Sequence, residues 1–170
     1  MAIYLIANGP MQTTAAFASV TTGTAIKTLL QVKSSATIIA RVTEWGISFD
    51  GFVGALPIKV EFIETDVAAT VTASVANDIT KVDPDALAGG DPTTNLIQVG
   101  TTSTGYTSTA EGTITAVRNL DAPQFISPMT QFIKQFPLGN EPAIQISKFA
   151  RIRVTAGTAV NAYCYISIRI

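Results

Sequence analysis

Apolar and polar residues alternate along much of this chain with the period of two that is typical of β-strands. The clearest run closes the sequence, and its apolar positions are Val160, Ala162, Cys164, Ile166, Ile168 and Ile170. Polar residues and two tyrosines fill the positions between them. The pattern predicts a final strand with one face in a hydrophobic core, up to and including Ile170.

Shorter runs of the same kind recur between Gly, Pro, Asn, Asp and Ser residues, which signal turns. We expect strands within residues 3–7, 25–33, 36–51, 57–67, 109–120, 131–138 and 143–149, followed by a terminal hairpin within 151–170. Within 36–51 the apolar phase shifts near Gly46, which predicts a β-bulge there. Residues 67–79 fit a helix and a strand equally well, because β-branched side chains disfavour the helix.

Eight or nine short strands with turn signals between them predict an all-β fold, an antiparallel β-sandwich. A jelly roll is the version that we expect, because the chain is long enough for eight strands and wide loops. Residues 80–108 are rich in Gly, Pro, Asp and Thr, and we expect them to form a long loop that could include a short strand within 95–100. We find no internal repeat and no linker, so residues 1–170 are expected to form a single domain.

The composition favours a protein that works in an assembly. Hydrophobic residues make up 47% of the chain and charged residues 14%, against about 25% charged residues in an ordinary soluble domain. Such a chain hides much of its surface in contacts with other subunits or covers it with uncharged hydroxyl groups. The net charge of −1 argues against a nucleic-acid partner, and no apolar run is long enough to span a membrane. Without a basic segment ahead of its first apolar run, the protein is expected to be soluble and made in the cytoplasm.

The sequence offers little material for catalysis. It has no histidine, which removes the commonest general base and metal ligand, and its single cysteine, Cys164, lies on the apolar face of the last strand. Asp83, Asp85 and Asp91 could hold Ca²⁺, but their spacing is not that of an EF-hand, and solvated turn residues are the favoured interpretation. We therefore expect no enzymatic activity, no cofactor and no metal site.

A few residues are candidates for a binding interface. Trp45 is either a stacking platform for a sugar or base, or an anchor in the core or an interface, and its place within a predicted strand favours an anchor. Tyr163, Tyr165, Arg169 and Ile170 share the last strand, and Tyr side chains suit interfaces because they combine contact area with a polar group. Arg151 and Arg153 alternate along another predicted strand, which favours a solvated face.

We single out four segments: "EWGISFDG" (44–51), "TAEGTITAVRN" (109–119), "FPLGNEP" (136–142) and "RIRVTAGTAVNAYCYI" (151–166). These segments resemble small virion proteins encoded in tailed-bacteriophage genomes, in particular head-decoration proteins. The resemblance implies a β-sandwich that forms homotrimers on the capsid surface and binds the lattice of the major capsid protein. It supplies no catalytic residues.

The expected function is therefore that of a non-enzymatic structural protein of the virion, made in the host cytoplasm. Two alternatives stay open: a tail or tail-tip component, and a carbohydrate-binding receptor module. A surface groove lined by several aromatic residues would favour the carbohydrate-binding alternative.

Overall fold

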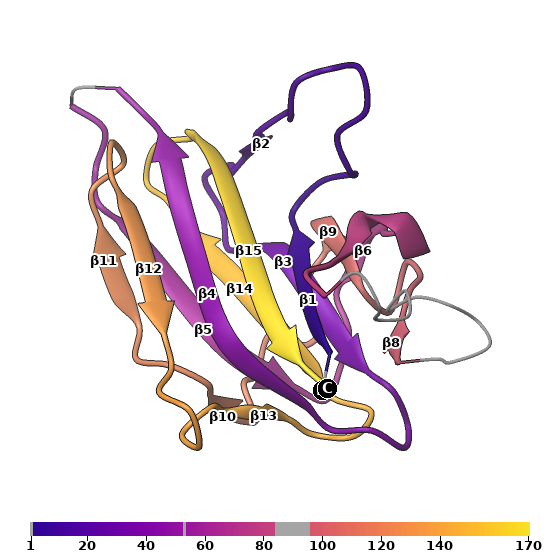
Figure 1. The fold of residues 1–170 in the computed structure, drawn as a ribbon. Helices are drawn as coiled ribbons and strands as arrows, with labels where there is room; N and C mark the ends of the chain where they lie inside the picture. Colours follow the sequence, from indigo (N-terminus) through magenta and orange to yellow (C-terminus); the bar gives the residue numbers. More distant parts are fainter. Residues whose placement is uncertain (1, 53, 84–95) are drawn as a thin grey trace.

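The computed structural model describes residues 2–52, 54–83 and 96–170, and these residues form two antiparallel β-sheets that pack face to face (Figure 1). The predicted all-β, antiparallel sandwich is confirmed. Helical structure in the described residues is limited to one 3₁₀ turn, η1 (Ala76–Asp78). In Figure 1 the long strands of the first sheet lie in front of those of the second.

The first sheet, called sheet A below, has the last strand of the chain at its centre. Its order is β12 (Gln131–Gln135), β4 (Ala40–Asp50), β15 (Asn161–Arg169), β1 (Ile3–Ala7) and β7 (Ile79–Lys81). Two short strands complete it: β13 (Ala143–Ile144) pairs with β4, and β2 (Val20–Thr21) pairs with β15.

The second sheet, sheet B, is built around β14. Its order is β10 (Arg118–Asn119), β5 (Ile58–Thr65), β14 (Phe149–Thr155), β3 (Lys27–Ser34), β9 (Gly105–Ala110) and β6 (Thr70–Ala73). The short strands β11 (Gln124–Ile126) and β8 (Ile97–Gln98) pair with β5 and β3.

The hydrophobic core lies between the sheets and takes alternate residues from the strands of both. Sheet A contributes Trp45, Ile47 and Ile166, and sheet B contributes Phe62 and Ile152; all are 2% exposed or less. Burying side chains of this size stabilises the fold by roughly 1.5–3 kcal/mol each. This burial explains why alternation was so clear in the sequence.

The predicted core face of the last strand is confirmed in full. Its buried residues are Val160, Ala162, Cys164, Ile166 and Ile168, and Ile170 is partly buried against the same cluster. The strand pairs along its length with β4 and β1, and the backbone of Ile170 exchanges two 2.9 Å hydrogen bonds with Ala2. A strand in the middle of a sheet has to keep its apolar face to its end.

Two local predictions need correction. The β-bulge of β4 lies at Thr43, because Glu44 pairs with Ser167 and Val42 with Ile168; it does not lie near Gly46. Residues 67–79, which fitted helix and strand equally well, form β6, the 3₁₀ turn η1 and the start of β7, and they contain no α-helix.

Other predicted strands prove to be something else. The run over 109–120 is a strand only to Ala110 and again at Arg118–Asn119, and Gly112, with φ +61°, turns the chain between them. The run over 143–149 is broken by a turn in which Ser147 has φ +60°. The predicted terminal hairpin is wrong, since β14 belongs to sheet B and β15 to sheet A.

The predicted loop over 80–108 is partly strand. Residues 80–81 lie in β7, 97–98 in β8 and 105–108 in β9. The short strand anticipated within 95–100 is confirmed for Ile97–Gln98. Asp85 and Asp91, considered above for Ca²⁺, lie outside the described residues.

Candidate functional site

Trp45 is a core residue and does not reach the surface of the folded chain. It is fully buried, and its ring lies 5.2 Å from that of Phe62 and 5.1 Å from that of Phe132. The indole nitrogen donates a 3.0 Å hydrogen bond to Asp121, which satisfies its one polar atom. Of the two roles considered for Trp45, the structure places it in the core, so it is not a surface stacking platform.

Tyr163 and Tyr165 lie on the outer face of sheet A, which is the face turned away from the core. Their ring centroids are 6.2 Å apart, and Phe17 packs edge-on against Tyr163 at 4.7 Å. The hydroxyl of Tyr165 donates a hydrogen bond to Glu44, and burial together with this carboxylate raises the pKa of Tyr165. The three aromatic side chains thus form a row on the sheet.

Arg169 and Ile170 lie apart from the tyrosine pair, at the end of the sandwich where the chain termini meet. Arg169 forms a 2.9 Å ion pair with Glu141, whose side chain is 1% exposed. The predicted interface residues are therefore divided among the core, the outer face of sheet A and this end.

A buried ionic layer lies on the outer face of sheet B, and no pattern in the sequence predicted it. Arg151 is fully buried and forms an ion pair with Glu111. The same carboxylate accepts hydrogen bonds from the backbone and hydroxyl of Thr28 and from Ser108. Burial alone would raise the pKa of Glu111, but these donors and the charge of Arg151 outweigh it and hold the pKa below its usual value.

Two further ion pairs extend this layer. Arg153, 9% exposed, donates to Glu61 at 2.7 Å, and its guanidinium also contacts the carbonyl of Ile114. Arg118 forms a bidentate pair with Glu64 at 3.0 Å. Arg151 and Arg153 were expected on a solvated face. They do point away from the core, but residues 111–118, called the strap below, cover them.

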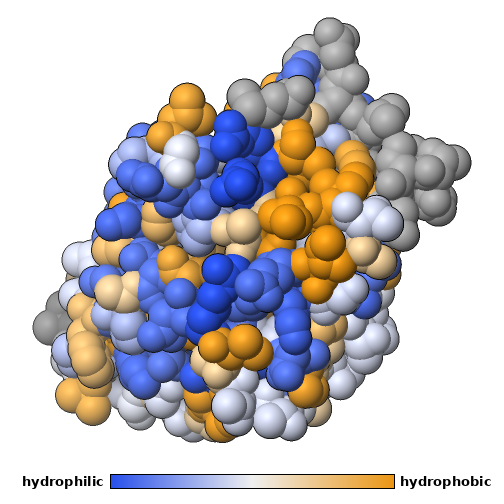
Figure 2. Space-filling view, turned by 90° about the horizontal axis from the view of Figure 1, so that it is seen from below, coloured by the Kyte–Doolittle hydropathy of each residue, from blue (hydrophilic) through white to orange (hydrophobic). Residues whose placement is uncertain are grey.

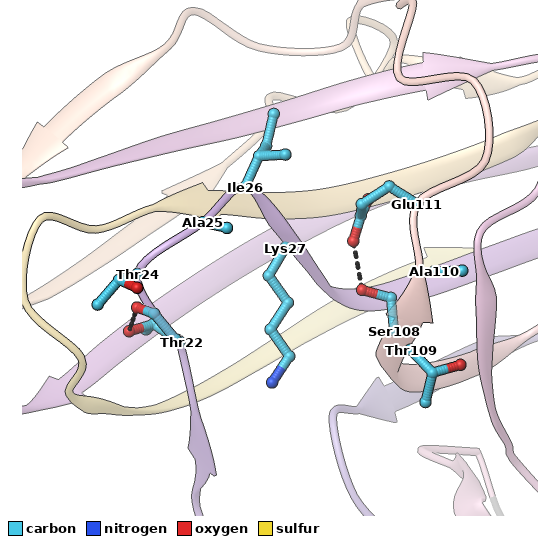
Figure 3. Close-up of a pocket in the computed structure, with 10 residues that line it drawn as sticks. Thr22, Thr24, Ala25, Ile26, Lys27, Ser108, Thr109, Ala110 and Glu111 are labelled. Atoms are coloured by element: carbon cyan, nitrogen blue, oxygen red, sulfur yellow. Dashed lines mark hydrogen bonds between the residues drawn. The ribbon is translucent and has the colours of Figure 1, made fainter.

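A cavity of about 270 Å³ lies beside this layer, between residues 22–27 and 108–111 (Figure 3). Its two ionisable side chains are already engaged: Glu111 with the donors named above, and Lys27 with the carbonyl of Thr21 at 2.8 Å. Hydroxyl and methyl groups of threonines make up much of the remaining lining. The cavity has no free acid, base or nucleophile among its described residues.

Cys164 is fully buried, and burial raises the pKa of its thiol, which opposes formation of a reactive thiolate.

No group of three or more His, Cys, Asp or Glu side chains in the described part of the chain is placed to hold a metal ion. No helix within 2–52, 54–83 and 96–170 is long and apolar enough to cross a membrane.

The end of the sandwich where the termini meet carries exposed apolar side chains from four connections. They are Ile39 (50% exposed), Val82 (58%), Leu138 (80%) and Ile146 (43%), and we call them the lower apolar surface. Three residues of sheet A lie next to them: Ala40 follows Ile39 and pairs with Ile144, and the N–H of Val82 donates a 2.9 Å hydrogen bond to the carbonyl of Ile3. Figure 2 views the molecule from this side and shows a band of hydrophobic surface in the upper right of the view.

Comparison with known proteins gives no relative for this chain. No protein-family model matches it, and neither a curated protein nor a solved structure does.

Proposed function

We propose that the protein is a non-enzymatic structural subunit of a bacteriophage particle, and in the first place a capsid decoration protein. In this role it associates with itself, as a trimer, and binds the lattice of the major capsid protein on the virion surface. A tail or tail-tip component is the second candidate, because it would need the same properties.

The observation that carries the proposal is the distribution of apolar and charged groups. Fourteen of the large apolar side chains in the described residues are exposed, whereas the charged residues Arg151, Arg153, Glu61 and Glu64 are buried and paired. A monomer that stays apart from its neighbours is expected to show the opposite distribution. Contiguous apolar surface, such as the band in Figure 2, marks contacts with other proteins.

We also infer that the sandwich is a jelly roll, an architecture found in viral capsid and lectin domains. The support is the strand order: β1, β15, β4 and β12 lie side by side in sheet A, while β3, β14, β5 and β10 lie side by side in sheet B. Strands that follow one another in the chain therefore cross repeatedly from one sheet to the other, as two interleaved Greek keys require.

The test uses two double variants with matched exposure at opposite ends of β4. Ile39→Lys with Val82→Lys places charges on the lower apolar surface, where the two residues are 50% and 58% exposed. Phe52→Lys with Leu56→Lys does the same beyond the other end of the strand, where they are 55% and 59% exposed. Sedimentation velocity up to high micromolar concentration measures the mass of each protein against the 17.9 kDa of one chain.

We expect the wild type and the Phe52/Leu56 variant to form oligomers and the Ile39/Val82 variant to sediment as single chains. A cryo-EM map of the particle from the phage that encodes the chain would then locate it on the head or on the tail. A wild-type protein that remains a single chain in solution and is missing from the particle would refute the proposal.

A further inference from the structure

On the outer face of sheet A, the ring of Tyr165 lies over the neighbouring strand. Tyr165 stands on β15, but its ring leans across β4 and lies on the backbone of Gly46. A Cβ at Gly46 would lie 2.7 Å from Cε1 of the ring and 3.0 Å from Cζ, so only glycine leaves room for it. The outer end of the ring therefore lies against the backbone of β4, and the Tyr165 side chain stays partly exposed.

A hollow of about 90 Å³ adjoins this ring. Its walls include both tyrosines and Ile133, and its polar groups are the side chains of Ser48 and Gln131. Ser48 pairs across the sheet with Tyr163 and with Gln131, so these three residues form one row next to the Tyr165 row. Neither Ser48 nor Gln131 makes a side-chain hydrogen bond with another described residue, so both are available to a ligand.

A second hollow, of about 60 Å³, lies on the other side of Tyr163 and is lined by residues of β1, β7 and the segment 9–12. Tyr163 thus separates two depressions on one face of the sheet. This arrangement suits an extended ligand made of small units better than one compact molecule, because a drug-sized ligand needs a pocket of about 300 Å³ or more.

We propose that this face binds a neutral oligosaccharide, with Tyr165 as the platform on which a sugar ring stacks and with Ser48 and Gln131 as partners for its hydroxyl groups. A sugar ring has an apolar face of C–H groups and a polar edge of hydroxyls. The site offers the matching pair: an aromatic face with hydroxyl and amide groups beside it. This function goes beyond a structural role and does not depend on it.

The charges at the site favour a neutral ligand over a cationic one. Two carboxylates next to the hollows are engaged: Glu44 accepts the Tyr165 hydroxyl, and Asp78 accepts the backbone N–H groups of Met11 and Val75. Arg169, further along the strand, is paired with Glu141, and the exposed Asp50 lies at the far end of β4 on the same face. A lysine or arginine side chain of a partner would find an aromatic ring here, but Glu44 and Asp78 are already occupied by other donors.

The experiment is affinity electrophoresis of the full chain in native gels that contain soluble neutral polysaccharides. The panel covers α- and β-linked polymers of glucose, mannose, galactose and N-acetylglucosamine. We expect at least one polysaccharide to retard the wild type. Tyr165→Ala and Gln131→Ala should weaken this binding, the tyrosine change by about tenfold or more.

Gly46→Ala separates positioning from folding. The new methyl group meets only the far end of the Tyr165 side chain, so we expect the ring to be displaced, saccharide binding to fall and the melting temperature to stay close to that of the wild type. Phe125→Ala, at a 77% exposed residue of sheet B, is the matched control and should bind like the wild type.

Two results would overturn the proposal. One is a wild type that no polysaccharide in the panel retards. If Tyr165→Ala also dissociates the oligomer in that case, the face is a subunit contact instead. The other is retardation that is equal in the wild type, Tyr165→Ala and Gly46→Ala.

Discussion

Replacing Glu111 with glutamine tests whether the ionic layer under the strap holds the strap in place. The substitution keeps the size of the side chain and removes its charge. Arg151, which is fully buried and whose Nη1 has no hydrogen-bond partner in the described structure, then loses its counter-ion. An NH₂ group also replaces one carboxylate oxygen. This hydrogen-bond donor then faces N–H, hydroxyl or guanidinium groups that donated hydrogen bonds to the carboxylate.

The expected cost is large because the remaining charge cannot reach water. Breaking a buried ion pair by removing one partner costs about 3–5 kcal/mol, out of the 5–15 kcal/mol or so that stabilise a typical domain. At about 2–4 °C per kcal/mol for a chain of this size, the melting temperature should fall by roughly 6–20 °C. Equilibrium urea denaturation at pH 7 measures the free energy directly.

Two controls show whether burial is the cause. Lys59→Met breaks the 2.8 Å pair with Glu61, but Lys59 is 41% exposed, so the cost should be about 0–1 kcal/mol. Arg151→Met combined with Glu111→Gln removes the unpaired buried charge and should recover much of the lost stability. If Glu111→Gln alone costs no more than Lys59→Met, the buried ionic layer does not stabilise the fold.

Three other predictions follow from the structure. A chain that ends at Tyr165 loses two buried isoleucines and the hydrogen bonds that residues 166–170 make with neighbouring strands, so it should be insoluble or melt at a much lower temperature. A melting temperature and an oligomer size equal to those of the full chain would contradict this. The folded pKa of Glu111 lies below its unfolded value of about 4.3. Its contribution to the free energy of unfolding is therefore present above that pH and is lost as the pH falls through the folded pKa. Glu111→Gln should for this reason reduce the loss of stability at acid pH that urea titrations measure. The buried Cys164 thiol should not react with a thiol reagent in the native protein and should react once in strong denaturant; rapid native reaction would show that the last strand opens.

Alternation predicted the faces of the strands well because each face is chosen by burial. Every apolar position from Val160 to Ile168 is buried, and the prediction needed only the period of two. Alternation does not say which strands pair. For this reason β14 and β15, which are close in sequence, were expected to form a hairpin and instead lie in different sheets.

The errors at single residues have the same origin. Arg151 and Arg153 were expected on a solvated face, but both are buried, because no local pattern shows that a distant segment covers that face. Trp45 could be core or surface from sequence alone, and the shift of register at Thr43 turns it inward. Gly46 was taken as the sign of a bulge, whereas it makes room for a ring from the neighbouring strand.

The two sheets differ in what their outer faces can offer to a partner. The strap covers part of sheet B and engages Arg151 and Arg153, so that face contributes mainly to stability. The outer face of sheet A keeps Tyr165 accessible, and the lower apolar surface lies beyond Arg169, further along the same strand. Because the sites occupy different parts of the molecule, Ile39→Lys with Val82→Lys should abolish assembly without affecting saccharide binding, and Tyr165→Ala should do the reverse. If either variant removes both properties while remaining folded by circular dichroism, one surface serves both, and the separation of roles between sheet face and sandwich end is wrong.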